Sequence, residues 1–64
     1  PEVSEVYEQV LKLPEKQRIA IHLFYYENYG VSAIASLMDC PESTVKSHLF
    51  RARARLKEAL KGGI

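Results

Sequence analysis

The sequence contains no tryptophan and only one cysteine, and its 64 residues include three glycines and three prolines. A single cysteine excludes the disulfide framework of many small secreted domains and fits a reducing cytoplasm. No apolar run approaches the roughly 18 residues of a membrane span, and no signal-peptide pattern occurs. We therefore expect a cytoplasmic protein without a membrane partner. Because the first residue is Pro1 rather than methionine, we also expect a fragment of a longer protein.

Residues that carry chemistry are also scarce. The two histidines do not lie with Cys40 at a spacing that could hold zinc. The chain has neither a glycine-rich phosphate loop nor a nucleophile motif, and its carboxylates are expected on the surface. We predict that the chain is not an enzyme and takes no metal or other cofactor. Cys40 is interpreted as a small apolar residue that packs in a turn.

Charge is unevenly distributed, although the net charge is only +1. Residues 1–32 carry five of the eight acids and three of the nine bases, and residues 33–64 carry the remaining three acids and six bases. The bases between Lys46 and Lys61 have few acids at i±4 with which to pair. This pattern favours a surface that binds a polyanion over a surface helix whose charges pair with one another in salt bridges.

The pattern of apolar residues predicts helices and no strands, over about residues 2–12, 14–27, 31–38 and 42–61. Pro14 and Pro41 each suit the first turn of the helix that follows. Between the second and third helices, Asn28 suits left-handed dihedral angles and Gly30 suits an N-cap, with Ser32 as a rival N-cap. The predicted fold class is all-α, a small four-helix domain that fills the whole chain.

The first helix shows the spacing of a one-faced amphipathic helix, and its predicted inward residues are Val3, Val6, Tyr7, Val10 and Leu11. The second helix ends in IAIHLFYY, which is apolar nearly all round and should be the most buried helix. His22 in this segment is interpreted as a boundary residue rather than a metal ligand. Tyr25, Tyr26 and Tyr29 are interpreted as core residues, with base stacking as the alternative.

Two helical segments meet at the short break Asp39-Cys40-Pro41, which predicts a helix-turn-helix. The domain is then of the winged-helix-like DNA-binding class without a wing. Before the break, the expected inward residues are Val31, Ile34, Ala35 and Met38, with Leu37 in the same apolar stripe. The second helix of such a motif usually enters the DNA major groove.

At 100° per residue, one sector of the last helix is apolar and predicts a core face: Val45, Leu49, Ala52, Leu56 and Leu60. The opposite sector holds Ser43, Ser47, Phe50, Arg51 and Ala54. Small hydroxyls, one aromatic ring and long cations suit a DNA groove, because cations reach phosphate or guanine and apolar atoms meet thymine methyl groups. The alternative is an ordinary solvated face with one exposed phenylalanine.

The segments LPEKQR, FYYENYGVSAIA and MDCPESTVKSHLFRARARL resemble region 4 of the sigma-70 family of bacterial RNA polymerase factors. The similarity is greatest to the extracytoplasmic-function (ECF, group IV) type, and its most specific part is TVKSHLFRARARL. The resemblance implies recognition of the promoter −35 element in double-stranded DNA and a role in transcription initiation. It also implies docking on the β-subunit flap of the RNA polymerase core, and an anti-sigma factor as a second partner.

Carried over by position, the resemblance implies two sets of DNA contacts. Base edges would be contacted by Lys46, Ser47, Phe50 and Arg51. Phosphates would be contacted by Thr44, His48, Arg53 and Arg55. The polymerase-facing surface would be an apolar patch made by the first two helices and the inner part of the last. The chain departs from the family pattern at His48 (usually arginine), at Glu42 (often small or apolar) and at Ser32-Ala33 (often acidic), so its promoter preference could differ.

Two other functions stay open at this point. A LuxR-type response-regulator output domain shares the TVKSH segment, but the arginine-alanine-arginine element and the lack of a threonine-leucine-threonine opening argue against it. Such a module dimerises through its last helix and binds a palindromic operator. A purely protein-binding helical module would show no salt-dependent affinity for DNA and would tolerate alanine at Arg51.

Overall fold

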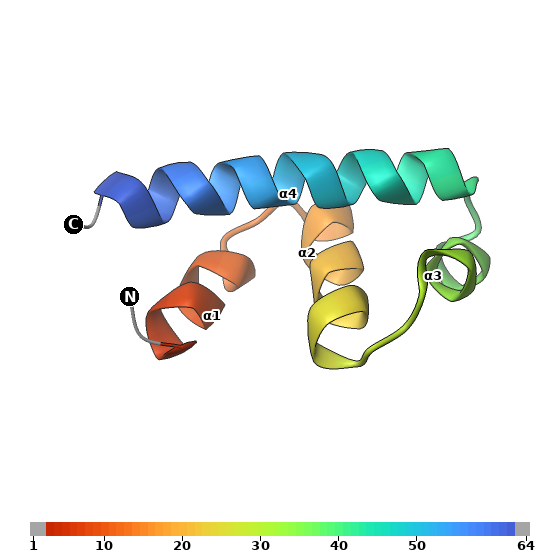
Figure 1. The fold of residues 1–64 in the computed structure, drawn as a ribbon, viewed down its shortest axis with the longest axis horizontal. Coiled ribbons are helices and arrows are strands. Elements are labelled where there is room, and N and C mark those ends of the chain that lie inside the picture. Colours follow the sequence, from red (N-terminus) through yellow and green to blue (C-terminus); the bar gives the residue numbers. More distant parts are fainter. Residues whose placement is uncertain (1–2, 63–64) are drawn as a thin grey trace.

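The computed structural model describes residues 3–62, and every regular element in that range is helical (Figure 1). The elements are α1 Val3–Leu11, α2 Glu15–Ile21, the π-helical turn η1 His22–Tyr26 that continues α2, α3 Val31–Met38 and α4 Glu42–Gly62. The predicted all-α class is therefore confirmed. No helix in this range is both long and apolar enough to cross a membrane.

Prolines mark the starts of α2 and α4. Pro14 has a φ of −53° and lies directly before α2, and its carbonyl accepts the N–H of Arg18 at 2.9 Å. Pro41 lies directly before α4, and its carbonyl accepts the N–H groups of Thr44 and Val45 at 3.0 and 3.2 Å. Proline suits this flank because its φ is already helical and its missing N–H would have had no partner there.

The second helix does not stay α-helical to residue 27, as the sequence predicted. It changes at His22, whose carbonyl accepts the N–H of Glu27 at 3.1 Å, the five-residue spacing of a π-helical turn. Because such a turn is wider than an α-helical turn, a wheel drawn at 100° per residue misplaces the side chains after Ile21.

The long helix α4 runs along one side of the molecule, whose extents are 36 × 18 × 15 Å (Figure 1). The other helices all lie against the same side of α4: α3 beside its first turns, α2 near its middle and α1 beside its C-terminal half (Figure 1). The side of α4 that is turned away from them has no neighbouring helix in the described part of the chain.

The core draws on every α-helix and on the link after α1, and its buried residues are Val10, Leu13, Ala20, Ile21, Ile34, Ala35, Val45, Leu49 and Ala52. The predicted core face of α4 is confirmed for its first half. Leu56 and Leu60 are only half-buried, because α1 covers the second half of α4 incompletely. Cys40 is partly buried and packs against the core, as its interpretation as a small apolar residue predicted.

The predicted inward face of α1 needs correction at Leu11 and Tyr7, and part of the prediction for this helix falls outside the described residues. Leu11 is 52% exposed and Tyr7 is also exposed, because both line an open groove between α1 and α2. The apolar stripe of α1 is thus wider than the surface that α2 and α4 cover. The expected start of this helix at Glu2 and the side chain of Val3 lie outside the described residues. In α3, Leu37 is likewise exposed rather than inward.

The core interpretation of Tyr25, Tyr26 and Tyr29 is wrong, because all of them are exposed. In the segment IAIHLFYY only Ala20 and Ile21 are fully buried. The buried part of the second helix ends where the π-helical turn begins, and that turn carries the aromatic residues to the rim of the core rather than into it.

Within residues 3–62, two residues other than glycine have a positive φ, Asn28 at 61° and Asp39 at 54°. The left-handed conformation predicted for Asn28 is confirmed. Gly30 takes the N-cap position of α3, so the rival position at Ser32 is excluded. Asp39 directly follows α3, and its left-handed conformation turns the chain towards α4.

The turn at Asp39 provides a stability prediction. A β-branched side chain is strained at positive φ, so Asp39→Val should lower the free energy of unfolding by about 1–2 kcal/mol. Asp39→Gly is the matched control, because glycine adopts this conformation without strain. Thermal unfolding followed by circular dichroism measures both, and equal melting temperatures for the two variants would contradict the expectation.

Candidate nucleic-acid interface

Helices α3 and α4 form the predicted helix-turn-helix. The N–H of Asp39 donates to the carbonyl of Ser36 at 3.3 Å, and the N–H of Cys40 donates to that of Ala35 at 3.0 Å, so the turn is closed by backbone hydrogen bonds. Ile34 of α3 and Val45 of α4 are both fully buried in the core. The first half of α4 therefore has a fixed orientation relative to the rest of the domain.

The four residues predicted to contact bases lie together on the open side of α4, and we call them the reading face: Lys46, Ser47, Phe50 and Arg51. All of them are exposed, and together with Arg53 they line one hollow in the surface. Phe50 is 71% exposed, the largest value among the large apolar side chains of the described part of the chain. An aromatic ring so far outside the core is available to a partner.

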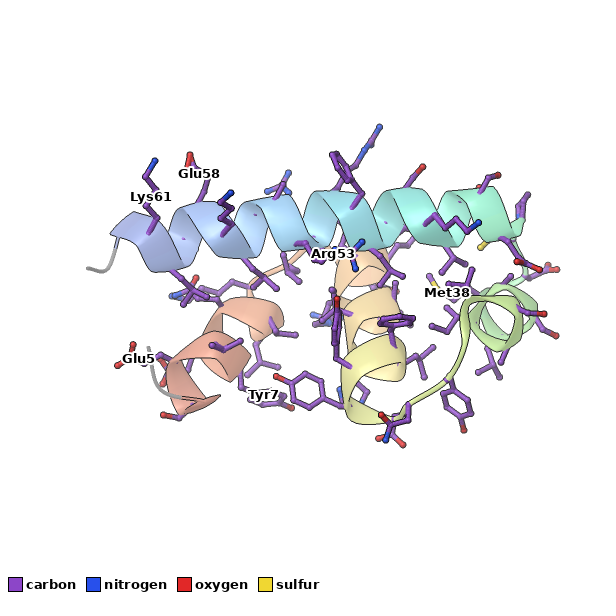
Figure 2. The ribbon with its side chains drawn as sticks, in the orientation of Figure 1. Glu5, Tyr7, Met38, Arg53, Glu58 and Lys61 are labelled. Atoms are coloured by element: carbon purple, nitrogen blue, oxygen red, sulfur yellow. The ribbon has the colours of Figure 1, made fainter. Side chains whose placement is uncertain are left out.

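The predicted phosphate ligands lie on two flanks of the reading face. Thr44 and His48 are half-buried on one flank. Arg53 lies on the other flank, where α2 meets α4 (Figure 2). Arg55 lies on the same flank as His48. It is roughly 10 Å further along the helix axis, because seven residues separate the two and each adds about 1.5 Å.

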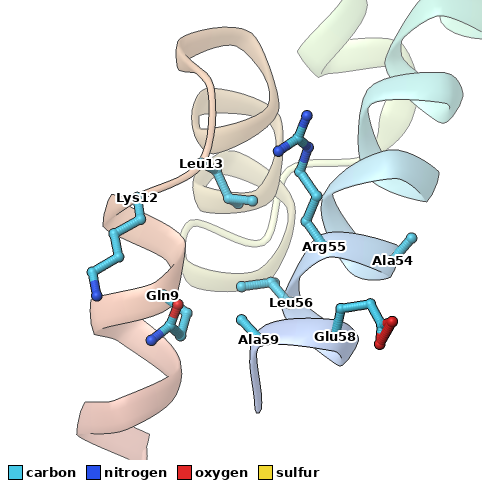
Figure 3. A pocket seen from close by; sticks show the side chains of 8 residues that line it. All are labelled: Gln9, Lys12, Leu13, Ala54, Arg55, Leu56, Glu58 and Ala59. Atoms are coloured by element: carbon cyan, nitrogen blue, oxygen red, sulfur yellow. The ribbon is translucent and has the colours of Figure 1, made fainter. Parts of the chain in front are cut away.

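Arg55 is not brought together with the reading face. It lines a pocket between α1 and α4 with Gln9, Lys12 and Leu13 of the α1 side (Figure 3). Glu58 lines the same pocket, so the surroundings of Arg55 are less cationic than those of Arg53. Of the predicted phosphate ligands, Arg55 is the one whose surroundings fit that role least.

Arg53 is tied to the end of the second helix. Its Nη1 donates a hydrogen bond to the hydroxyl oxygen of Tyr25 at 2.9 Å, across 28 residues of sequence. The ring of Tyr25 in turn meets the ring of Phe24 edge-on, with the ring centroids 4.9 Å apart. Sequence reasoning missed this role of Tyr25, because no periodic pattern links residues so far apart.

A second exposed surface lies between α1 and α2, where Tyr7, Leu11, Ile19 and Leu23 line the apolar groove. Its edge carries an aromatic cluster in which the ring of Tyr26 meets that of Tyr7 edge-on and stacks on that of His22, at 5.5 Å in both cases. His22 Nε2 lies 3.4 Å from Glu27 Oε2, which agrees with its interpretation as a boundary residue. This groove and the hollow of the reading face have no lining residue in common.

Among the described residues, no three side chains of histidine, cysteine, aspartate or glutamate gather closely enough to hold a metal ion. The reading face of α4 exposes two cations, one hydroxyl group and one aromatic ring. The fold and this surface together define a helix-turn-helix domain with a cationic second helix.

Comparison with known proteins places this domain in a family. Residues 4–56 match the sequence profile of the family described as sigma-70, region 4. The RNA polymerase sigma-H factor of Pseudomonas aeruginosa is 39% identical over 57 residues, which are 89% of this chain and 30% of that protein. The ECF RNA polymerase sigma-E factor of Haemophilus influenzae is 38% identical over 55 residues, which are 86% of this chain and 29% of that protein.

The sigma-E factor of Escherichia coli K12 is 44% identical over 48 residues, which are 75% of this chain and 25% of that protein. The chain thus belongs to the sigma-70 region 4 family, and the predicted family is confirmed. It spans less than a third of the length of these relatives.

Proposed function

We propose that this chain recognises the promoter −35 element as region 4 of an ECF-type RNA polymerase sigma factor, and that it works in the bacterial cytoplasm. The observation that carries the proposal is the reading face. It lies on the second helix of a helix-turn-helix, on the side that no other helix within residues 3–62 covers, and it exposes Phe50 between cations and a hydroxyl group. The names of the relatives support the ECF type.

In this proposal Lys46, Ser47, Phe50 and Arg51 contact base edges in the major groove. Side chains of these types can do so, because cations donate to guanine, hydroxyl groups accept or donate, and an aromatic ring packs on thymine methyl groups. Thr44, His48 and Arg53 contact the phosphates on either side. Arg55 belongs to this set as its weakest member, because it lies beside α1.

The polymerase core is the proposed protein partner, through the β-subunit flap. The groove between α1 and α2 is a suitable surface, because its lining is largely apolar and includes no residue of the reading face. DNA and polymerase could therefore be bound at the same time. An anti-sigma factor that covers either surface would block one of the two contacts.

Selection from a pool of random DNA duplexes tests this function. The chain should enrich a short sequence without internal two-fold symmetry, because one domain presents one reading face. Enrichment of a palindrome bound by a dimer would favour the LuxR-type alternative. Failure to bind any duplex at low salt would contradict the proposal. The protein-binding helical module would then be the remaining alternative.

Salt dependence provides the next prediction. With roughly three to five phosphate contacts, the logarithm of the association constant should fall with the logarithm of salt concentration at a slope between about −2.7 and −4.5. Arg53→Ala should lower the affinity for every duplex alike and reduce the steepness of this slope by about one unit. Fluorescence anisotropy titrations at several salt concentrations measure both quantities.

The matched comparison is Arg55→Ala, which removes the same charge from the flank beside α1. It should change the slope less than Arg53→Ala does, because Arg55 lies further from the reading face. An Arg53→Ala variant with an unchanged slope would show that Arg53 does not contact a phosphate.

A further inference from the structure

We propose that Tyr25 and Arg53 form one phosphate-binding unit, in which the tyrosine hydroxyl is a DNA contact supplied from outside the helix-turn-helix. The inference rests on the proposed DNA-binding function and extends it to η1, the turn at the end of the second helix. The juxtaposition that carries it is the hydrogen bond from Arg53 Nη1 to the hydroxyl oxygen of Tyr25 at 2.9 Å.

The direction of this hydrogen bond is fixed by chemistry. A guanidinium group has donors only, so the oxygen of Tyr25 must be the acceptor. The hydroxyl proton of Tyr25 is therefore not used in this bond and can be donated to another oxygen. The N–H groups of Arg53 that do not face Tyr25 stay available as well. The pair thus offers two kinds of donor side by side, one charged and one neutral.

The pair also lies where a DNA strand would pass. Arg53 lines the same hollow as Lys46, Ser47, Phe50 and Arg51. A protein that contacts base edges with one face of a helix meets the phosphates at the flanks of that face. Both side chains are exposed, and Tyr25 has half of its surface open to solvent. A phosphate oxygen at this flank can accept from both donors.

The tyrosine is held in place before any ligand arrives. Its ring meets the ring of Phe24 edge-on at 4.9 Å, and Phe24 packs against the core. The hydrogen bond to Arg53 fixes the other end of the side chain. Because both side chains are already ordered, less conformational entropy is lost on binding than for two free surface side chains.

The test is the pair of variants Tyr25→Phe and Tyr26→Phe in the 64-residue chain. Each removes one exposed tyrosine hydroxyl from η1, but the ring of Tyr26 lies beside those of Tyr7 and His22, whereas Arg53 is hydrogen-bonded to Tyr25. Anisotropy titrations use the duplex enriched in the selection and an unrelated duplex of the same length, at three salt concentrations. Circular dichroism establishes a temperature at which all variants are folded.

Tyr25→Phe should weaken binding of both duplexes by about three- to tenfold, the effect of one hydrogen bond. The slope against salt should stay that of the wild type, because the slope counts neutralised phosphate charges and a hydroxyl carries none. Tyr26→Phe should bind as the wild type does. In the Arg53→Ala background, Tyr25→Phe should have a smaller effect, because the hydroxyl is no longer fixed.

Other outcomes overturn the inference in distinct ways. If Tyr25→Phe binds both duplexes as tightly as Tyr26→Phe, the hydrogen bond only ties α4 to η1, and the proposed function is untouched. A loss restricted to the enriched duplex would make Tyr25 a residue that reads sequence, which also contradicts a phosphate contact. A wild-type chain that binds neither duplex would instead remove the proposed function itself.

Discussion

Leu49→Ala is expected to lower the free energy of unfolding by about 2–5 kcal/mol, the usual cost of removing a leucine side chain from a packed core. Leu49 is 3% exposed and lies among the buried residues that α4 shares with the other helices. A domain of this size has a total stability of roughly 3–10 kcal/mol. The variant should therefore unfold at a much lower temperature, and part of it should be unfolded at 37 °C.

Phe50→Ala is the matched control, because Phe50 is the next residue on the same helix but points away from the core. With most of its surface exposed, its removal should change the free energy of unfolding by no more than about 1 kcal/mol. Leu56→Ala should fall between the two, at about 1–2 kcal/mol, because Leu56 is only half-buried. Urea unfolding followed by circular dichroism measures all three.

Equal losses for Leu49→Ala and Phe50→Ala would contradict the orientation of α4. That result would place Phe50 in a core and would also remove it from the reading face. The stability measurement therefore tests a premise of the proposed function without any DNA, since it asks which side of α4 is covered.

The fold class could be predicted from the sequence because apolar periodicity and turn residues agree. Asn28 takes the left-handed conformation, and Gly30 caps α3. Both features are set by the steric preferences of the residue itself and of its near neighbours in the sequence. The open side of α4 could be predicted for the same reason, since the 3.6-residue repeat separates core from surface along one helix.

Other features could not be predicted, because they depend on contacts between distant segments. The periodicity of α1 does not reveal how much of its apolar stripe a neighbour covers, so Leu11 was expected inside and lies in an open groove. A wheel at 100° per residue assumes an α-helix, and the π-helical turn breaks that assumption before Tyr25. The bond from Arg53 to Tyr25 joins residues 28 positions apart, for which sequence periodicity has no signal.

Arg51→Ala is expected to relax discrimination at one base pair of the −35 element by about 1–3 kcal/mol. Arg51 is exposed on the reading face beside Ser47 and Phe50, where a guanidinium group can donate to both acceptors of a guanine edge. Arg53 points about 160° away from it around the helix, since the two residues are two steps of 100° apart. The two arginines should therefore have different roles: Arg51 contacts a base and contributes to sequence specificity, whereas Arg53 contacts a phosphate and contributes affinity for any sequence.

The measurement is a titration of each variant against the enriched duplex and a panel of its single-base changes. Arg51→Ala should bind one of these changed duplexes almost as well as the original, whereas Arg53→Ala should weaken all of them by the same factor. Arg51→Lys distinguishes the effect of the hydrogen-bonding geometry from that of the positive charge. Lysine keeps the charge but cannot form the two parallel hydrogen bonds of a guanidinium group. This variant should retain the salt slope of the wild type and still lose discrimination. Equal, sequence-independent losses for Arg51→Ala and Arg53→Ala would leave α4 a cationic helix that binds phosphates without reading bases.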